Sequence, residues 1–179
     1  MIVRMETYAA PQTTQVDRQD LAGIYDLYSQ AIFRYAYRLL GDQDHAEECV
    51  AETFSRYLGA VRDGRRPENV KAYLYRIAHN WITDSYRRQP VSNILDMDMH
   101  ADPQDDPEDR TDHNLEMERL REALRRLPAE QRLVVSMRFL EELSHDEVAT
   151  ILDKTVEATR ALQHRAVAAL RRMLIEQEE

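Results

Sequence analysis

The sequence predicts an all-α fold of two small helical domains joined by an extended acidic linker, the C-terminal domain containing a helix-turn-helix. Gly and Pro are scarce, with 4 and 6 residues among 179, and the helix-favouring Leu, Ala, Arg and Glu dominate. Apolar residues recur at three- and four-residue steps in both halves of the chain. Between the halves, residues 89–114 combine Pro with many Asp residues, a composition that cannot collapse into a core.

The N-terminal part is expected to begin with a tail and a long helix. Residues 1–19 carry Gln, Thr and Pro without apolar periodicity, which is typical of a mobile tail. From Leu21 the apolar residues follow helical spacing until Gly41 ends the run. Either Asp42 or Asp44 can cap a second helix directly afterwards.

That second helix is predicted to end at about Leu58, because Gly59 and residues 63–67 read as a loop. A third helix is predicted over about residues 68–88, with its apolar positions on one side. The three helices complete a predicted first domain, residues 20–88.

The acidic charge of the chain is concentrated in its middle. The formal net charge is -9, and residues 89–114 contribute most of it, with eight acidic residues and one basic residue. A segment of about 25 extended residues reaches at most roughly 80 Å, so the two domains can work at separated sites. An overall acidic charge also weakens unspecific encounter with DNA.

The second domain, residues 115–179, is predicted to contain a helix-turn-helix. A break at Pro128 suits the first turn of a helix. Ser144 and Glu147 form the capping box of a short helix, and Thr155 caps a longer helix that follows. Two helices joined by a three-residue turn are typical of this motif.

The longer helix presents polar residues that can enter a DNA major groove. They share one face at helical spacing: Glu157, Arg160, Ala161 and His164, with Arg165 beside them. Arg160 can pair with guanine or hold a phosphate. On this evidence alone, the solvated side of a helical bundle is the more frequent explanation of such a face.

Other classes of function are disfavoured. No stretch reaches the roughly 18 apolar residues of a membrane span, and the N-terminus lacks a signal pattern, so we expect a cytoplasmic protein. The single cysteine, Cys49, is expected to be buried. No His or Cys cluster has metal-site spacing, and no phosphate loop or nucleophile setting is present, so we expect no metal, no cofactor and no enzyme activity.

Three segments carry a resemblance to a known family. YAYRLLGDQDHAEECVAETFSRYL, residues 35–58, resembles the sigma region 2 helix that docks on the clamp of RNA polymerase. AYLYRIAHNWITDSYRR, residues 72–88, resembles the helix that reads and helps open the minus-ten element. Residues 124–174, which contain LRRLPAEQRLVVSMRFLEELSHDEVATIL, are similar to region 4, which binds the minus-thirty-five element and the polymerase flap. Their order identifies the chain as similar to the extracytoplasmic-function (ECF) RNA polymerase sigma factors of the sigma-70 family.

The resemblance implies site residues in the first domain. Those facing the polymerase clamp would be Glu48, Glu52, Phe54 and Leu58. Plain core packing stays open for the last two, and Ala51 stands where family members usually have Gln. Those facing minus-ten DNA, expected to lie away from the strongest apolar stripe, would be Lys71, Tyr75, Arg76, His79, Asn80, Asp84 and Arg87.

Two further features of the first domain follow from the resemblance. Arg76 and Ile77 stand where primary sigma factors have paired Trp, which suggests weaker melting and stricter promoter choice. The loop at residues 62–69 matches the place where the family builds a pocket for a flipped base, although an ordinary turn is equally compatible.

In the second domain the resemblance implies minus-thirty-five contacts from seven residues: Arg138, Thr155, Glu157, Arg160, Ala161, His164 and Arg165. Asp153 stands where the family turn often has Gly, but Asp tolerates left-handed geometry better than most residues. Thr159 replaces a common apolar residue.

The expected partners are therefore core RNA polymerase, promoter DNA and an anti-sigma factor. Two alternatives remain open at this stage: an adaptor that mimics a sigma factor and sequesters its regulator, and a stand-alone helix-turn-helix repressor.

Overall fold

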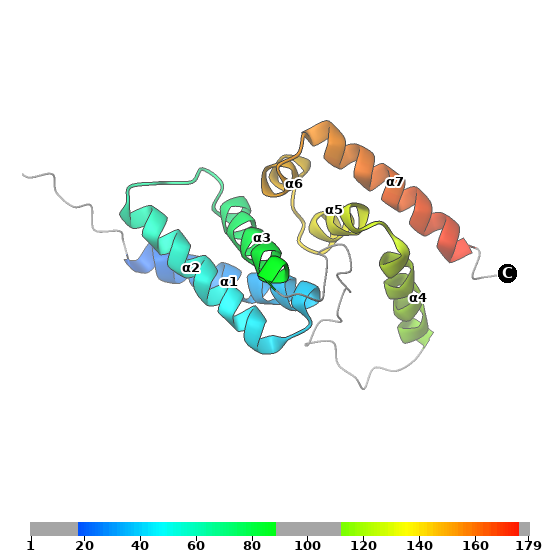
Figure 1. Ribbon diagram of the computed structural model, residues 1–179, viewed down its shortest axis with the longest axis horizontal. Coiled ribbons are helices and arrows are strands. Elements are labelled where there is room, and N and C mark those ends of the chain that lie inside the picture. Colours follow the sequence, from blue (N-terminus) through cyan, green and yellow to red (C-terminus); the bar gives the residue numbers. More distant parts are fainter. Residues whose placement is uncertain (1–17, 89–111, 176–179) are drawn as a thin grey trace, which may run out of the picture.

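The computed structural model describes residues 18–88 and 112–175, and within these ranges the chain is helical with no strand (Figure 1). The predicted all-α fold is confirmed. The predicted tail and acidic linker fall mostly outside the described residues. The helices are α1 Arg18–Leu40, α2 Gln43–Arg62, α3 Val70–Arg88, α4 Asp112–Arg126, α5 Ala129–Phe139, α6 His145–Leu152 and α7 Val156–Ile175.

The first three helices pack together as an N-terminal unit. The apolar stripes of α1, α2 and α3 meet in a core whose largest fully buried side chains include Tyr35, Leu74 and Ile82. Asp42 begins α2, because its carboxylate accepts a hydrogen bond of 2.8 Å from the His45 amide. Of the two predicted capping residues, the first is therefore the one used.

The second helix is longer than the sequence indicated. It continues through Gly59 and ends at Arg62, so the predicted loop at Gly59 is wrong. Tyr57 and Ala60 are both buried, and their packing outweighs the cost of about 1 kcal/mol for one glycine inside a helix. The left-handed backbone of the turn falls instead on Gly64, with φ 84°.

The last four helices form a C-terminal unit. As predicted, the chain breaks between α4 and α5, but Pro128 lies at the N-cap rather than inside the first turn. Leu127, Val135 and Ala166 form a small buried cluster that joins α4, α5 and α7. Since α4 begins at Asp112, the helix starts slightly before the predicted domain boundary.

The two units lie against each other. The first helix of the helix-turn-helix, α6, packs on α3 (Figure 1). Met137, Leu143 and Val148 of the C-terminal unit belong to the same continuous apolar core as Ile32 and Leu74 of the N-terminal unit. The structure thus brings together two domains that the sequence alone treats as separate.

Candidate nucleic-acid interface

The helix-turn-helix has the predicted geometry. Ser144 and Glu147 make both hydrogen bonds of the capping box at the start of α6. Asp153, the first of the three residues between α6 and α7, adopts the left-handed conformation, with φ 53° and ψ 49°. The hydroxyl of Thr155 accepts a hydrogen bond of 3.1 Å from the Ala158 amide and so caps α7. The turn therefore fixes where α7 begins and which side it exposes.

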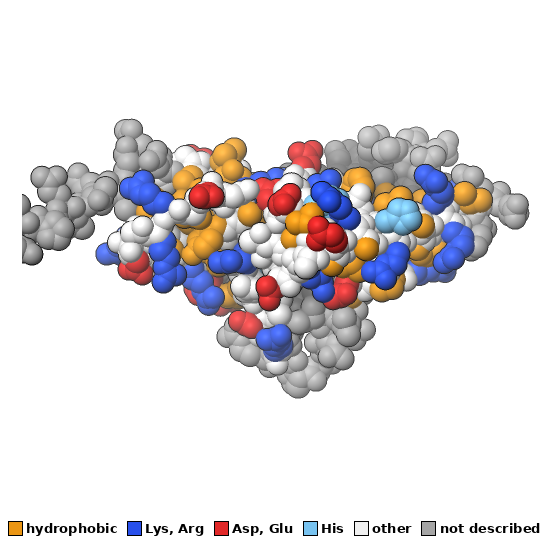
Figure 2. All heavy atoms as spheres, turned by 90° about the horizontal axis from the view of Figure 1, so that it is seen from above, with side chains coloured by type: hydrophobic (Ala, Val, Ile, Leu, Met, Phe, Trp, Pro, Cys, Tyr) orange, Lys and Arg blue, Asp and Glu red, His pale blue; other side chains and the backbone are white. Residues whose placement is uncertain are grey.

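The exposed side of α7 carries the residues predicted to face DNA. All five are exposed: Glu157, Arg160, Ala161, His164 and Arg165. Figure 2 looks onto the side of the molecule where α6 and α7 lie, and its Lys and Arg side chains are interspersed with acidic ones. Along α7 itself basic side chains predominate, since the exposed Arg160, Arg165, Arg171 and Arg172 stand against the single carboxylate of Glu157. This helix can therefore attract phosphates, while base contacts supply the selectivity.

A polar contact holds α7 to α6. Thr159 is fully buried, and its hydroxyl donates a hydrogen bond of 2.8 Å to the Val156 carbonyl. The same hydroxyl lies 3.2 Å from Nδ1 of His145. Burial, followed by the nearby charges of Arg138 and Arg160, lowers the pKa of His145. The hydroxyl of Thr159 is therefore paired although the side chain is fully buried.

Arg138 is half-buried and braces the C-terminal unit. Its Nε donates a hydrogen bond of 3.1 Å to the Gln163 side chain on α7, and its guanidinium also bonds to the Leu143 carbonyl. The residue therefore links α5, the following loop and α7. Any phosphate contact by Arg138 would have to use the guanidinium N–H groups that do not bond to Gln163 or to the Leu143 carbonyl.

The seven residues predicted to face minus-ten DNA fall on two sides of α3. Four are exposed: Arg76, Asn80, Asp84 and Arg87. The guanidinium of Arg76 lies over the Tyr73 ring, 5.5 Å from its centroid, and Asp84 lies 3.8 Å from Arg87. This exposed side offers cations, an amide and an aromatic ring, which are groups that bind single-stranded DNA.

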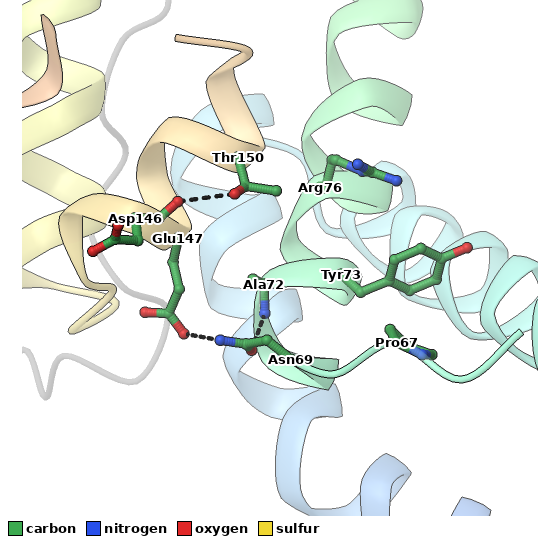
Figure 3. A pocket seen from close by; sticks show the side chains of 8 residues that line it. All are labelled: Pro67, Asn69, Ala72, Tyr73, Arg76, Asp146, Glu147 and Thr150. Carbon is green, nitrogen blue, oxygen red and sulfur yellow. Dashed lines mark hydrogen bonds between the residues drawn. The ribbon is translucent and has the colours of Figure 1, made fainter. Parts of the chain in front are cut away.

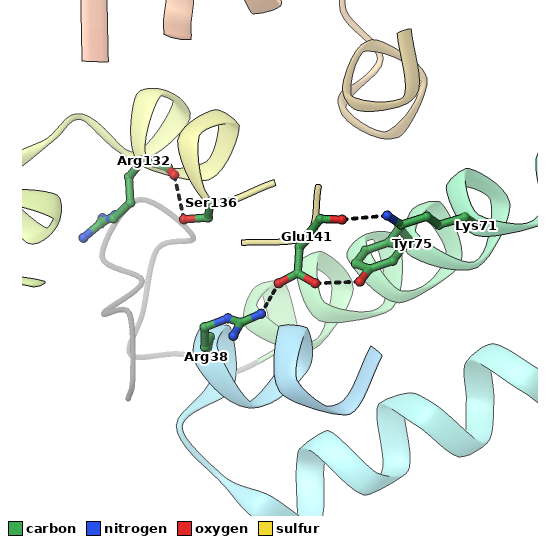
Figure 4. A network of polar contacts seen from close by, with 6 residues as sticks. All are labelled: Arg38, Lys71, Tyr75, Arg132, Ser136 and Glu141. Carbon is green, nitrogen blue, oxygen red and sulfur yellow. Dashed lines mark hydrogen bonds and ion pairs between the residues drawn. The ribbon is translucent and has the colours of Figure 1, made fainter. Parts of the chain in front are cut away.

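The other three of these residues, Lys71, Tyr75 and His79, face the protein. Tyr75 is 1% exposed, so it belongs to the core rather than lying away from the apolar stripe as expected. Its hydroxyl donates a hydrogen bond of 2.6 Å to Glu141 of the C-terminal unit, and Lys71 donates one of 2.7 Å to the Glu141 carbonyl (Figure 4). Burial and then Glu141 raise the pKa of Tyr75, which keeps the phenol neutral and able to donate.

His79 is paired within the N-terminal unit. Its Nδ1 lies 3.0 Å from the Tyr35 hydroxyl. Burial lowers the pKa of His79 to about 4, so the imidazole is neutral at physiological pH. In this conformation His79 cannot supply a cation for DNA.

A pocket of about 330 Å³ opens where α3 meets α6 (Figure 3). Tyr73 and Arg76 line it from α3, and Asp146 and Thr150 line it from α6, with Pro67 from the preceding loop. The predicted flipped-base pocket involved this loop, but the cavity found here also needs the C-terminal unit. Its walls therefore depend on how the two units are packed.

The residues predicted to face the polymerase clamp lie along α2. Glu48 is exposed, Glu52 pairs with Arg56 at 2.6 Å, and Leu58 is 38% exposed. Phe54 is half-buried, and its ring meets the Tyr25 ring edge-on, with centroids 4.8 Å apart. These aromatic rings and Leu58 leave apolar surface at the junction of α1 and α2.

Tyr25 is a surface residue that the sequence alone did not single out. Its helical spacing with Leu21 and Tyr28 indicates core, yet Tyr25 is 49% exposed and the neighbouring Leu27 is 67% exposed. Leu27 lies about 200° around the helix from Tyr25, so only Tyr25 joins the apolar surface of Phe54 and Leu58. Exposed apolar side chains grouped like these three often mark a protein interface. Periodicity could not reveal it, because a helix packed on only two neighbours leaves part of its apolar side uncovered.

Within the part of the chain that the structure describes, no cluster of His, Cys, Asp and Glu has the arrangement of a metal site. In the same ranges, no helix is long and apolar enough to cross a membrane.

Comparison with known families gives two matches along the chain. Residues 24–90 match the family model for sigma-70 region 2, and residues 123–172 match that for sigma-70 region 4. Among curated proteins, the chain is 33% identical over 172 residues to the ECF RNA polymerase sigma factor BldN of Streptomyces coelicolor, covering 91% of this chain and 64% of that protein. It is 31% identical over 160 residues to the ECF RNA polymerase sigma factor SigL of Mycobacterium tuberculosis, covering 87% of this chain and 89% of SigL.

Two solved structures share the fold. CnrH, solved in complex with the cytosolic domain of CnrY, matches with a TM-score of 0.61 and 21% identity over 92% of this chain and 94% of that one. RpoE from Bartonella quintana, solved in complex with the anti-sigma factor NepR, matches with a TM-score of 0.66 and 20% identity over 87% of this chain and 97% of that one. At this level of identity the likeness concerns the fold.

Proposed function

Because this chain belongs to the ECF RNA polymerase sigma factors of the sigma-70 family, we propose that it binds core RNA polymerase and directs it to promoters. The observation that carries this function is the presence of region 2 and region 4, in that order, in one chain. Region 2 would recognise the minus-ten element and region 4 the minus-thirty-five element. The protein would be a non-enzymatic subunit acting in the cytoplasm, where the polymerase is.

The exposed side of α7 is the proposed minus-thirty-five surface. Arg160 lies one turn after the capped start of the helix, and the N-terminal part of such a helix is the part that reaches base edges. His164 follows one turn later on the same side. Glu157 can accept a hydrogen bond from a cytosine amine, while Arg160 can pair with guanine. Thr155 and Arg138 would contribute to the site mainly by fixing the position of α7.

The exposed side of α3 is the proposed minus-ten surface. Arg76 and Arg87 supply cations for phosphates, Asn80 supplies an amide for a base edge, and the Tyr73 ring can stack on a base. Lys71 and Tyr75 would join this surface only if Glu141 moved away from them. The number of α3 residues that can contact DNA therefore depends on whether the C-terminal unit is packed against this helix.

The apolar surface at the junction of α1 and α2 is the proposed contact with the polymerase clamp. Leu58, Phe54 and Tyr25 form its centre, and Glu48 and Glu52 provide a charged edge. A partly apolar patch with polar edges is the usual composition of a protein interface. The exposed Ala51 offers less contact area than the Gln that the family usually has there.

We also propose an anti-sigma factor as a partner. CnrH was solved with the cytosolic domain of CnrY, and RpoE with the anti-sigma factor NepR. The fold they share with this chain supports the proposal, but no residue of the chain identifies the partner.

The direct test is run-off transcription with core RNA polymerase from the source organism on its genomic DNA, with and without the protein. We expect discrete transcripts only when the protein is added. Absence of transcripts despite tight polymerase binding would favour the sequestering mimic, and DNA binding without affinity for polymerase would favour the repressor.

A further inference from the structure

The two units are joined by a buried charge in the loop between α5 and α6. The side chain of Glu141 is 3% exposed although it is a carboxylate. It forms an ion pair with Arg38 at the end of α1 and accepts the hydrogen bond from Tyr75 on α3 (Figure 4). With the Lys71 bond to its carbonyl, this single residue of the C-terminal unit receives three donors from the N-terminal unit.

Such an arrangement is sensitive to the loss of any one partner. A buried ion pair adds little net stability compared with apolar packing, but removing one partner leaves an uncompensated buried charge, which is strongly unfavourable. The side chain of Arg38 is only 12% exposed, so water cannot readily replace the carboxylate. The contact therefore selects one packing of the two units over others.

The backbone of the loop helps to present Glu141. The following residue, Glu142, has φ 51°, a left-handed conformation that non-glycine residues seldom adopt. The Leu143 amide donates a hydrogen bond of 3.0 Å to the Met137 carbonyl, which closes the loop onto the end of α5. This turn projects Glu141 out of the C-terminal unit toward α1 and α3.

The packing of the two units against each other is incompatible with simultaneous binding of both promoter elements. The elements named minus-ten and minus-thirty-five are about 25 base pairs apart, or roughly 85 Å along B-form DNA. Helix α7 packs on α6, and α6 packs on α3. Two successive helix packings place α7 only about 20 Å from α3. The chain in this conformation cannot contact both elements at once.

We propose that Glu141 is an intramolecular latch that holds the free protein in a closed conformation and must be released before both promoter elements can be bound. The inference rests on the proposed function and adds a regulatory contact to it. Release would uncover Lys71, Tyr75 and Arg38, which are two cations and an aromatic ring, next to the exposed minus-ten surface. The carboxylate thus occupies a place that suits a DNA phosphate.

The test measures the distance between the units in the full-length protein. Spin labels are attached to cysteines introduced at the exposed positions Ala22 on α1 and Ala168 on α7, in a Cys49→Ala background. Electron-spin resonance then gives the distance distribution for the otherwise unchanged protein, for Glu141→Gln and for Arg38→Gln. Glu142→Gln is the matched control, since that neighbouring carboxylate is exposed.

We expect one short distance for the unchanged protein and for the control, and a longer, broader distribution for both latch variants. The open fraction should rise at least about tenfold, because each variant removes the buried ion pair that joins the two units. The double variant should open no further than either single variant, since both remove the same contact. Circular dichroism and thermal melting establish that each variant remains folded.

An unchanged distance distribution in both folded latch variants would overturn the latch, as would a broad distribution in the unchanged protein. Affinity for core polymerase provides the functional readout: we expect Glu141→Gln to bind at least about tenfold more tightly, in proportion to its larger open fraction. If the unchanged protein drives transcription but the variants neither open nor bind more tightly, the latch fails and the proposed function stands. If the variants open but no form drives transcription, the proposed function fails and the latch role with it.

Discussion

The side chain of Asn69, which caps α3, donates a hydrogen bond of 2.7 Å to the carboxylate of Glu147, which belongs to the capping box of α6 (Figure 3). Two helix N-termini from different units are therefore joined through their caps. Burial alone would raise the pKa of Glu147, but hydrogen bonds from Ser144 and Asn69 keep it below its usual value. This contact lies beside the Glu141 cluster and supports the same packing.

Replacing Asn69 with Asp should weaken the contact between the units while leaving α3 intact. The new carboxylate can still accept the bond from the Ala72 amide, but it repels Glu147 instead of donating to it. We expect faster hydrogen exchange at the start of α6 and unchanged exchange within α3, measured by mass spectrometry. Asn80→Asp, the same change at an exposed position of α3, is the control. Equal exchange in both variants would contradict the prediction.

Replacing Arg160 with Ala should reduce transcription from promoters that depend on the minus-thirty-five element by about 5- to 150-fold, since one specific base contact contributes roughly 1–3 kcal/mol. The fold should be unaffected, because Arg160 is exposed. Transcription is compared on templates with intact and altered minus-thirty-five sequences. Arg172→Ala, at an exposed position three turns further along α7, should have little effect. A similar loss from both variants would contradict a specific role for Arg160.

Replacing Leu58 with Ala should weaken binding to core polymerase more than it weakens the fold. Leu58 is 38% exposed, so truncation costs less than about 1 kcal/mol of stability. Ile175→Ala removes a 56% exposed apolar side chain from the far end of the other unit and serves as the control. Binding is measured by fluorescence anisotropy of the labelled protein. For Ala51→Gln we expect the reverse change, tighter binding to core polymerase. If neither Leu58→Ala nor Ala51→Gln alters the affinity, the apolar surface at the junction of α1 and α2 is not the contact with the clamp.

His79 should make stability depend on pH. The pKa of His79 is about 4 in the folded protein, below its ordinary value of 6.5, so the folded state binds fewer protons than the unfolded state between these values. Stability should therefore fall as the pH is lowered from 6.5 to 4, by up to roughly 3 kcal/mol from this residue. Urea unfolding is followed at several pH values for the wild type and for His79→Gln. The two pH profiles should differ only below about pH 6.5, and parallel profiles would exclude His79 as the cause.

Cys49 should be unreactive in the folded protein. The thiol is buried, and this burial raises the pKa of Cys49 to about 12. Because only the thiolate attacks disulfide reagents, labelling at pH 8 should be slow until the protein unfolds. Rapid labelling under native conditions, followed by absorbance, would show that α2 and α3 open locally far more often than this packing implies.

Local chemistry made much of the fold predictable from the sequence. The capping box at Ser144, the cap at Thr155 and the left-handed Asp153 each depend on residues close together in the chain. The exposed side of α7 follows in the same way, because helical spacing and a defined starting residue fix which side chains point outward. Each of these features depends on residues close together in the chain and not on tertiary contacts.

Features that depend on distant contacts were not predictable. The sequence places Tyr75 on the surface of α3, but its ring packs against Tyr35 of α1 and its hydroxyl donates to Glu141, 66 residues away in the sequence. Gly59 looked like a helix end, and packing of its neighbours overrides that signal. The packing of α6 on α3 likewise leaves no sign in local periodicity, since periodicity shows which side of a helix is buried but not which distant helix covers it.

Within the polymerase complex, α3 and α7 should contact two separate elements of one promoter. A photoreactive amino acid is placed at Asn80 or at His164, and the crosslinked bases are mapped on a promoter found by run-off transcription. We predict crosslinks at two sites about 25 base pairs apart, each requiring core polymerase, with position 80 nearer the start of transcription. Crosslinks from both positions to one site, or crosslinks that form equally well without polymerase, would contradict the account.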